Sequence, residues 1–147
     1  MARLYIAYGS NMNVEQMAVR CPTAKLVGKT MMKNWRLLFC SVATIERHKG
    51  SKVPILVWDL QPEDEAALDI YEGYPRLYRK ETVRIPIRGR KMSVMVYIMN
   101  SNRLSPPNAS YLETIRDGYK VADFDIRILD EAVKISSERR KPYEFRY

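Results

Sequence analysis

Alternating apolar positions near the N-terminus predict the first strand. Residues 3 to 8 read RLYIAY, so every second side chain lies on the same face of an extended chain. A short helix capped by Asn13 is expected to follow, because Gln16 stands three positions later, as in a capping box. This helix should end before Pro22, since proline disfavours helical conformation in the residue that precedes it.

Two further strands are predicted over residues 34–43 and 53–60. The second is almost entirely apolar, which favours a central position covered on both faces. The polar segment 44–52 between them is predicted to be a loop. A helix over residues 62–72 comes next, with acidic residues at its positive end and Gly73 as the residue that terminates it.

A β-hairpin is predicted in the second half of the chain. Residues 77–88 and 91–99 have the character of strands, and Gly89 lies between them as the turn. Pro86 favours an edge or bulge position for the first of these strands, because proline cannot donate a hydrogen bond to a neighbour.

Two helices are predicted to close the chain. Ser110 with Glu113 has the spacing of a capping box, and Asp125 is a candidate cap for the last helix. Consecutive strands outnumber crossover helices, which favours an α+β class with a mixed or antiparallel sheet, open or closed, and helices packed outside it. A regular doubly wound parallel sheet is disfavoured.

Composition limits the kinds of protein this chain can be. It has 147 residues, of which 46% are hydrophobic and 29% charged, which suits one domain with a substantial core. No apolar run approaches the roughly 18 residues of a membrane span. The N-terminus lacks the apolar region and cleavage site of a secretory signal, so the expected compartment is the cytoplasm.

Few residues in this chain are suited to binding a metal. Cys21, Cys40 and His48 are scattered along the chain, which argues against a structural zinc site. His48 is the only histidine, so a Ser-His-Asp triad would have to include it. An enzyme with this composition is expected to use a carboxylate, a lysine or a tyrosine as its acid or base.

The chain carries a net charge of +8, and two stretches hold the excess. Residues 76–91 contain seven basic residues and one acidic residue, and residues 134–146 contain five basic and two acidic residues. Nucleic acid is the natural partner hypothesis. A solvated basic face is the favoured interpretation, because no aromatic stacking pattern accompanies the charge.

Candidate chemistry begins directly after the first strand, in the sequence YGSNM of residues 8–12. Glycine permits a sharp turn, and successive N–H groups in such a turn can bind a carboxylate or an oxyanion. An ordinary strand-to-helix turn is the alternative.

Glu72 is the second candidate. It lies in the last turn of the 62–72 helix, at the negative end of the helix dipole, which is unfavourable for a carboxylate. Its aromatic and apolar neighbours could desolvate it and raise its pKa, as a general base working near neutral pH requires. An exposed glutamate that tolerates its position is the alternative. Tyr78 and Tyr111 each stand beside a predicted break and are weaker candidates.

These candidates occur together in an order that resembles the γ-glutamylcyclotransferase-like family, which includes γ-glutamylamine cyclotransferases and AIG2-like proteins. The matching segments run through most of the chain in the order LYIAYGSNM, RCP, WRLLF, VWDLQPEDEAALDIYEGYPRLYRK, VYIMN and SPPNASYLETIRDGYK.

The resemblance implies one domain over residues 1–147, with a small mixed β-barrel flanked by helices. It implies that Glu72 is the catalytic acid/base. It also implies that the substrate is bound by the turn Tyr8, Gly9, Ser10, Asn11 and Met12 together with Tyr78 and Tyr111.

The reaction implied by the resemblance converts a γ-glutamyl amide, either a γ-glutamyl amino acid or a γ-glutamylamine, to 5-oxoproline and a free amine. It needs no metal, nucleotide or other cofactor, and the partner is a small molecule rather than a membrane. The oligomeric state is open, a homodimer included. The alternative is a catalytically silent member whose basic surface binds nucleic acid or another acidic partner. If the chain is an enzyme, the basic stretch 76–91 is expected to favour acidic substrates.

Overall fold

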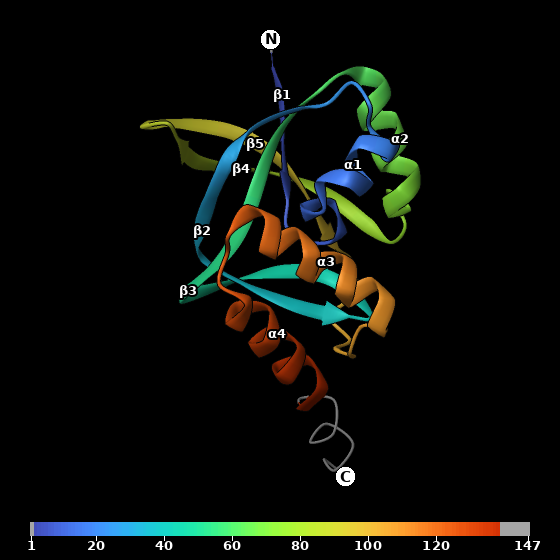
Figure 1. Ribbon diagram of the computed structural model, residues 1–147, viewed down its shortest axis with the longest axis vertical. Coiled ribbons are helices and arrows are strands. Elements are labelled where there is room, and N and C mark those ends of the chain that lie inside the picture. Colours follow the sequence, from blue (N-terminus) through green and yellow to red (C-terminus); the bar gives the residue numbers. More distant parts are fainter. Residues whose placement is uncertain (1, 139–147) are drawn as a thin grey trace.

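The computed structural model describes residues 2–138, which form five strands, a 3-10 turn and four α-helices (Figure 1). In chain order the elements are β1 (Arg3–Ala7), η1 (Ser10–Met12), α1 (Val14–Arg20), β2 (Lys25–Cys40), β3 (Val42–Leu60), α2 (Pro62–Glu72), β4 (Tyr78–Ile87), β5 (Arg90–Met99), α3 (Ala109–Ala122) and α4 (Ile126–Glu138).

The strands form one mixed sheet in the order β2-β3-β1-β5-β4. β1 lies at its centre, antiparallel to β3 and parallel to β5, and every other pairing is antiparallel. The α+β class is confirmed. The expected barrel holds only loosely, because the edge strands β2 and β4 do not pair with each other in the described part of the chain. A hydrogen bond of 2.7 Å from the Arg88 side chain to the Val27 carbonyl connects these edges instead.

The predicted capping residues of α1 and α2 are confirmed, and that of α3 is corrected. The Asn13 side chain accepts a hydrogen bond from the Gln16 N–H at 3.1 Å and begins α1. Gly73 ends α2 with a φ of 66°, a left-handed conformation that glycine adopts without steric cost. For α3 the predicted cap Ser110 is wrong. Asn108 caps this helix, because its side-chain oxygen accepts from the Tyr111 N–H at 2.8 Å.

The segment 44–52, predicted as a loop, is part of β3. β2 also begins nine residues before the strand predicted at residue 34, so the two strands form one long hairpin that turns at Ser41. Its polar segment could not be told from a loop by pattern, since Thr44 and Ile45 are buried but residues 46–52 are exposed or only partly buried. A bulge interrupts the pairing where Asn34, with φ 68°, accepts a hydrogen bond from the Gly50 N–H.

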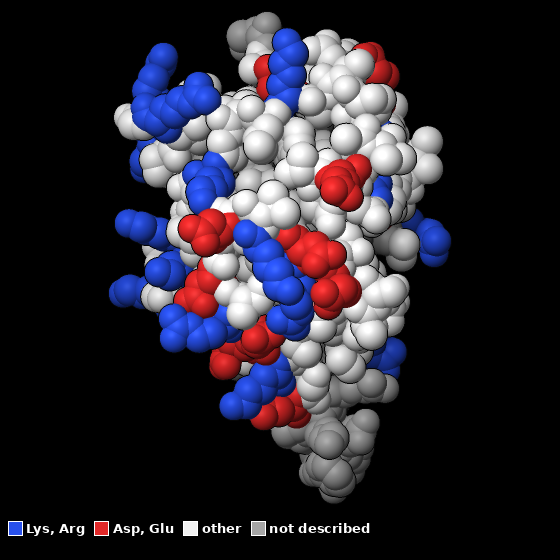
Figure 2. All heavy atoms as spheres, viewed as in Figure 1, with Lys and Arg blue, Asp and Glu red and all other residues white. Residues whose placement is uncertain are grey.

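The β4–β5 hairpin turns at Arg88 and Gly89, both of which have positive φ. This two-residue turn is the predicted one, and β4 is an edge strand, as Pro86 indicated. Most of the basic residues of the stretch 76–91 lie on this hairpin. Blue side chains gather where its tip projects, whereas over α3 and α4 positive and negative side chains are interspersed (Figure 2).

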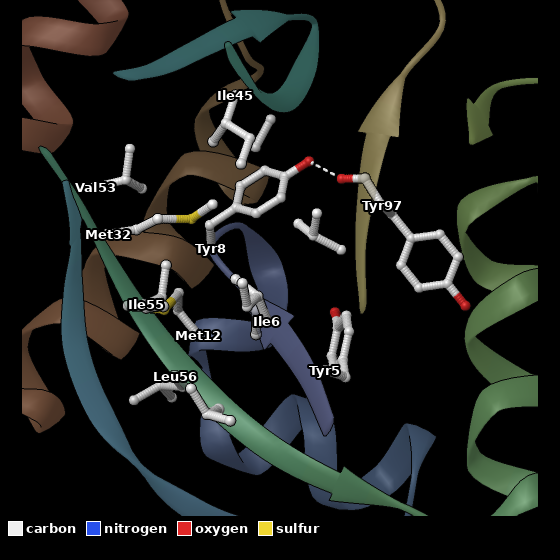
Figure 3. Close-up of a cluster of buried hydrophobic side chains, with 14 of the residues drawn as sticks. Tyr5, Ile6, Tyr8, Met12, Met32, Ile45, Val53, Ile55, Leu56 and Tyr97 are labelled. Atoms are coloured by element: carbon white, nitrogen blue, oxygen red, sulfur yellow. Dashed lines mark hydrogen bonds between the residues drawn. The ribbon is translucent and has the colours of Figure 1, made fainter. Parts of the chain in front are cut away.

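The core lies between the sheet and its helices. Apolar side chains of β1, η1, β2 and β3 pack together on one side of β1, and tyrosines from β1 and β5 lie on the other (Figure 3). α4 is joined to β2 by a buried hydrogen bond of 2.8 Å from the Phe39 N–H to the Ser136 hydroxyl. Most of the basic tail 134–146 lies outside the described residues.

The contact between α3 and η1 fixes the position of the segment that follows β1. Gly118 of α3 packs directly on this segment, and a Cβ atom added there would lie 2.5 Å from the Met12 carbonyl oxygen. Because that neighbour is backbone, α3 and η1 would have to separate to admit a side chain.

We expect Gly118→Ala to lower the free energy of unfolding by about 1–3 kcal/mol through this overlap. Gly28→Ala is the matched control, because an added Cβ at Gly28 meets no atom within 4 Å. Urea unfolding of both variants measures the difference. Equal free energies of unfolding for Gly118→Ala and Gly28→Ala would show that α3 and η1 are not in close contact at Gly118.

Candidate active site

A cavity of about 280 Å³ opens where the end of β1, the end of α2, the β2–β3 turn and the start of β4 meet. Its lining residues are Tyr5, Ile6, Tyr8, Gly9, Ser10, Asn11, Val42, Ala43, Tyr71, Glu72, Leu77, Tyr78, Tyr97 and Tyr111. Of the eight site residues predicted from the sequence, all line it except Met12. Met12 is fully buried in the core, so its side chain is a packing residue rather than part of the cavity wall.

The turn after β1 lines the cavity and contains main-chain N–H groups that its own folding leaves unused. The N–H groups of Met12 and Asn13 donate to Gly9 and Ser10 carbonyls at 3.0 Å and form the 3-10 turn. The N–H groups of Gly9, Ser10 and Asn11 donate to no other group within residues 2–138. Three adjacent N–H groups without an internal acceptor are suited to bind an anion.

Close approach requires glycine at position 9. A Cβ atom there would lie 3.0 Å from the Ala43 Cβ and 3.3 Å from the Tyr111 hydroxyl oxygen. The turn therefore packs against the β2–β3 hairpin and α3 at the same point, and the cavity retains its volume only without a side chain here.

Side chains of the turn form hydrogen bonds with residues of β1, α1 and α2. Asn11, 2% exposed, accepts a hydrogen bond from Arg20 and donates one to the Tyr5 hydroxyl at 2.9 Å. The Ser10 and Tyr71 hydroxyls are 2.7 Å apart. The Arg20 guanidinium stacks on the Tyr71 ring, 3.5 Å from its centroid. Polar contacts thus fix the turn without occupying its three N–H groups.

Glu72 lines the same cavity as this turn. Its carboxyl group is partly buried and makes no hydrogen bond or ion pair within the described part of the chain. Burial raises the pKa of Glu72 to about 7, and the positive charge of Arg20 opposes this rise. A carboxyl group in this state exchanges its proton near neutral pH.

Tyr78 and Tyr111 contact the same residue of β3 with opposite polarity. The Tyr78 hydroxyl donates to the Ala43 carbonyl at 2.6 Å, and the Tyr111 hydroxyl accepts from the Ala43 N–H at 3.0 Å. Tyr78 can therefore only accept a hydrogen bond from a ligand, whereas Tyr111 can donate one. Burial is the main cause that raises the pKa of both hydroxyls, so both stay protonated.

The sequence reasoning missed three tyrosines of the cavity wall, namely Tyr5, Tyr71 and Tyr97. Tyr71 directly precedes Glu72 on α2, and Tyr97 lies on β5, far from both motifs in sequence. Tyr5 lies on the face of β1 opposite Leu4, in a strand where both faces are buried. No local signal distinguishes such residues from core tyrosines.

The basic stretch 76–91 contributes only Leu77 and Tyr78 to the cavity wall. Lys80 is ion-paired with Glu65 and Asp69 at 2.7 and 2.9 Å, and Arg79 with Glu81. In the described residues, no lysine, arginine or histidine lines the cavity. The expected preference for acidic substrates stays a prediction that this arrangement does not support.

Comparison with known proteins gives the family. The sequence profile described as gamma-glutamyl cyclotransferase, AIG2-like, matches residues 5–126. The chain belongs to this family. A γ-glutamylcyclotransferase from Mus musculus is 27% identical over 131 residues, which cover 80% of this chain and 70% of the mouse protein. The Homo sapiens γ-glutamylcyclotransferase has the same identity over the same length.

A solved structure named gamma-glutamyl cyclotransferase has the same fold, with a TM-score of 0.78 and 23% identity over 90% of this chain and 86% of that one. The protein is thus a member of a cyclotransferase enzyme family, and its profile match spans both the turn after β1 and Glu72. Among residues 2–138, no helix has the length and apolar character needed to cross a membrane.

The raised pKa of Glu72 predicts a pH-dependent stability. Between pH 4.5 and 7 the folded protein holds a proton at Glu72 that the unfolded chain has released, so this group lowers the free energy of unfolding as pH rises through that window. Glu72→Gln should therefore be more stable than wild type at pH 8, by up to about 3 kcal/mol, and similar to it near pH 4.5.

Urea unfolding from pH 4.5 to 8 measures this difference. Glu63→Gln is the matched control, because Glu63 is exposed on the same helix. A constant difference between wild type and Glu72→Gln across this range would contradict the burial of the carboxyl group.

Proposed function

We propose that this protein cyclises a γ-glutamyl amide, releasing 5-oxoproline and a free amine, with Glu72 as general acid/base. One observation carries the proposal. An unpaired carboxyl group with a pKa of about 7 shares a cavity with the free N–H groups of Gly9, Ser10 and Asn11. Membership of the cyclotransferase family supports the same reaction.

The substrate carries its own nucleophile. Its α-amine is tethered to the γ-carbonyl carbon, and attack closes a five-membered lactam. The protein then needs only to hold the chain in a folded conformation, and oriented intramolecular attack can supply roughly 7–11 kcal/mol of barrier reduction. A cavity of about 280 Å³ with preorganised walls suits this task.

Proton transfer is the remaining requirement. The α-amine is mostly protonated at neutral pH, so Glu72 takes a proton from it before or during attack. The C–N bond of the lactam forms, the γ-carbonyl oxygen gains negative charge, and the old C–N bond then breaks. Its electron pair stays on the departing nitrogen, which receives the proton from Glu72, so a single group serves both steps.

The hydrogen-bond polarity of the walls fits the two charged groups of a γ-glutamyl unit. The Tyr78 hydroxyl, whose proton is donated to Ala43, and the Glu72 carboxylate accept hydrogen bonds from the α-ammonium. Tyr111, with its own proton free, and the N–H groups of the turn donate to the α-carboxylate. Both kinds of contact are present before substrate binds, which avoids the cost of reorganisation.

Glu72→Gln should reduce kcat by about 10²–10⁴-fold, because glutamine keeps the shape of the side chain and removes the base. The assay follows 5-oxoproline release from a panel of γ-glutamyl amino acids and γ-glutamylamines. Glu63→Gln on the same helix is expected to keep wild-type rates. If folded Glu72→Gln forms 5-oxoproline at the wild-type rate, Glu72 is not the base. If the wild-type protein forms no 5-oxoproline from any substrate of the panel, the proposed reaction is wrong.

The pH dependence of kcat/KM provides an independent check. Glu72 must be ionised to accept the amine proton, so kcat/KM should fall about tenfold per unit of pH below a pKa of about 7. Initial rates between pH 5 and 8 measure this limb of the profile. A rate independent of pH down to 5 would mean that a group of much lower pKa acts instead.

A further inference from the structure

The direction of every hydrogen bond around Asn11 is fixed by chemistry. A guanidinium group has only donors, so the Asn11 atom that contacts Arg20 must be the amide oxygen. The amide nitrogen therefore faces Tyr5 and donates to its hydroxyl oxygen at 2.9 Å. As a consequence the Tyr5 oxygen is an acceptor in this contact, and its own proton remains to be donated elsewhere.

No group within residues 2–138 accepts that proton. Tyr5 is only 3% exposed, yet its side chain lines the cavity. Other tyrosines of the wall differ: the Tyr8 hydroxyl donates to the Tyr97 carbonyl at 2.6 Å, and the Tyr97 hydroxyl to Asp69 at 2.5 Å. Figure 3 shows the Tyr8 hydroxyl joined by a dashed line to the main chain of Tyr97, and the Tyr5 ring on the other side of β1.

A buried donor without an internal acceptor is costly, and because Tyr5 lines the cavity, a bound ligand can supply the acceptor. We propose that Tyr5 is a catalytic residue whose hydroxyl donates a hydrogen bond to the γ-carbonyl oxygen of the substrate and stabilises the negative charge that develops there. This inference rests on the proposed cyclisation and assigns a role to a residue outside the motifs that suggested it.

The position of Tyr5 relative to the other donors favours the γ-carbonyl oxygen over the α-carboxylate. The Tyr111 hydroxyl lies at the Gly9 end of the turn, as its 3.3 Å distance from a Cβ built on Gly9 shows, whereas Tyr5 is joined to the Asn11 end. The end of α2 that carries Glu72 is tied to the same end of the turn, because Tyr71 contacts Ser10 and Arg20, and Arg20 donates to Asn11. The γ-carbon must lie beside Glu72, because both nitrogens that exchange protons with that base bond to it.

The step keeps its atoms and electrons in balance without a proton from Tyr5. When the amine nitrogen attacks, the carbonyl π electrons move to oxygen, and Tyr5 donates a stronger hydrogen bond to that oxygen than to the ground-state carbonyl. When the leaving nitrogen departs, the electrons return and the carbonyl re-forms. Tyr5 keeps its proton throughout, and Glu72 alone transfers one.

Tyr5→Phe tests the assignment, since it removes the hydroxyl and keeps the ring that packs edge-on against Tyr97 at a centroid distance of 5.9 Å. We expect kcat to fall about 10²–10³-fold with little change in KM, because the lost contact is strongest in the transition state. Tyr119→Phe is the matched control. Its hydroxyl is also fully buried, has no partner in the described residues and lies outside the cavity wall, so wild-type kcat is expected.

Tyr5→Phe also removes the acceptor of the Asn11 amide, so a second variant separates the two effects. Replacing Tyr5 with O-methyltyrosine keeps an oxygen that accepts from Asn11 and removes the proton donated to the substrate, so kcat should stay as low as in Tyr5→Phe. Thermal unfolding of each variant confirms that it is folded.

These experiments distinguish an error in the role of Tyr5 from an error in the proposed cyclisation. If wild type forms 5-oxoproline and folded Tyr5→Phe does so at a similar kcat, the cyclisation stands and the role of Tyr5 is wrong. The same holds if the folded O-methyltyrosine protein has a kcat close to that of wild type. If wild type forms no 5-oxoproline from any γ-glutamyl compound, both proposals fall together.

Discussion

Burial of one carboxyl group without a partner is the constraint on which the candidate site depends. Two glutamates of α2 show what environment does to the same side chain. Hydrogen bonding to Arg3 is the leading cause that lowers the pKa of Glu65 to about 2, with Lys80 adding to it. Glu72, two turns later, has no such partner, and burial raises its pKa to about 7. The ion-paired glutamate joins α2 to β1 and β4, and the unpaired one is left to exchange protons.

Hydrogen-bond direction gives the cavity a polarity that its composition does not reveal. Six tyrosines line it, and a tyrosine hydroxyl can donate or accept. Contacts with the protein decide this for every one of the six except Tyr71, which can donate to or accept from Ser10. Tyr78 and Tyr8 donate to main-chain carbonyls, whereas Tyr111 accepts from a main-chain N–H and Tyr5 from Asn11. Acceptors and donors are thereby sorted before any ligand binds, which is the arrangement that electrostatic catalysis requires.

Sheet topology brings the two halves of the site together. β1 is the central strand, so the turn that follows it emerges in the middle of one end of the sheet rather than at an edge (Figure 1). α2 follows β3, the neighbour of β1, and its last turn ends at the same cavity. Packing of α3 on the turn, with Gly118 against the Met12 carbonyl, then holds the loop in place.

The amino-acid sequence alone determined the helix ends and turns, because these depend on residues that are neighbours in the chain. The bounds of α2, the Asn13 cap and the hairpin turn at Gly89 follow from capping, dipole and turn preferences, and the motifs pointed to Glu72 and to the turn at Gly9. Tertiary structure decided the rest. It made the polar segment 44–52 a strand, because long-range pairing with β2 overrides local polarity. It also brought Tyr5, Tyr71 and Tyr97 to the cavity and fixed the hydrogen-bond direction of the Tyr5 and Tyr97 hydroxyls, since these properties come from contacts that no local pattern encodes.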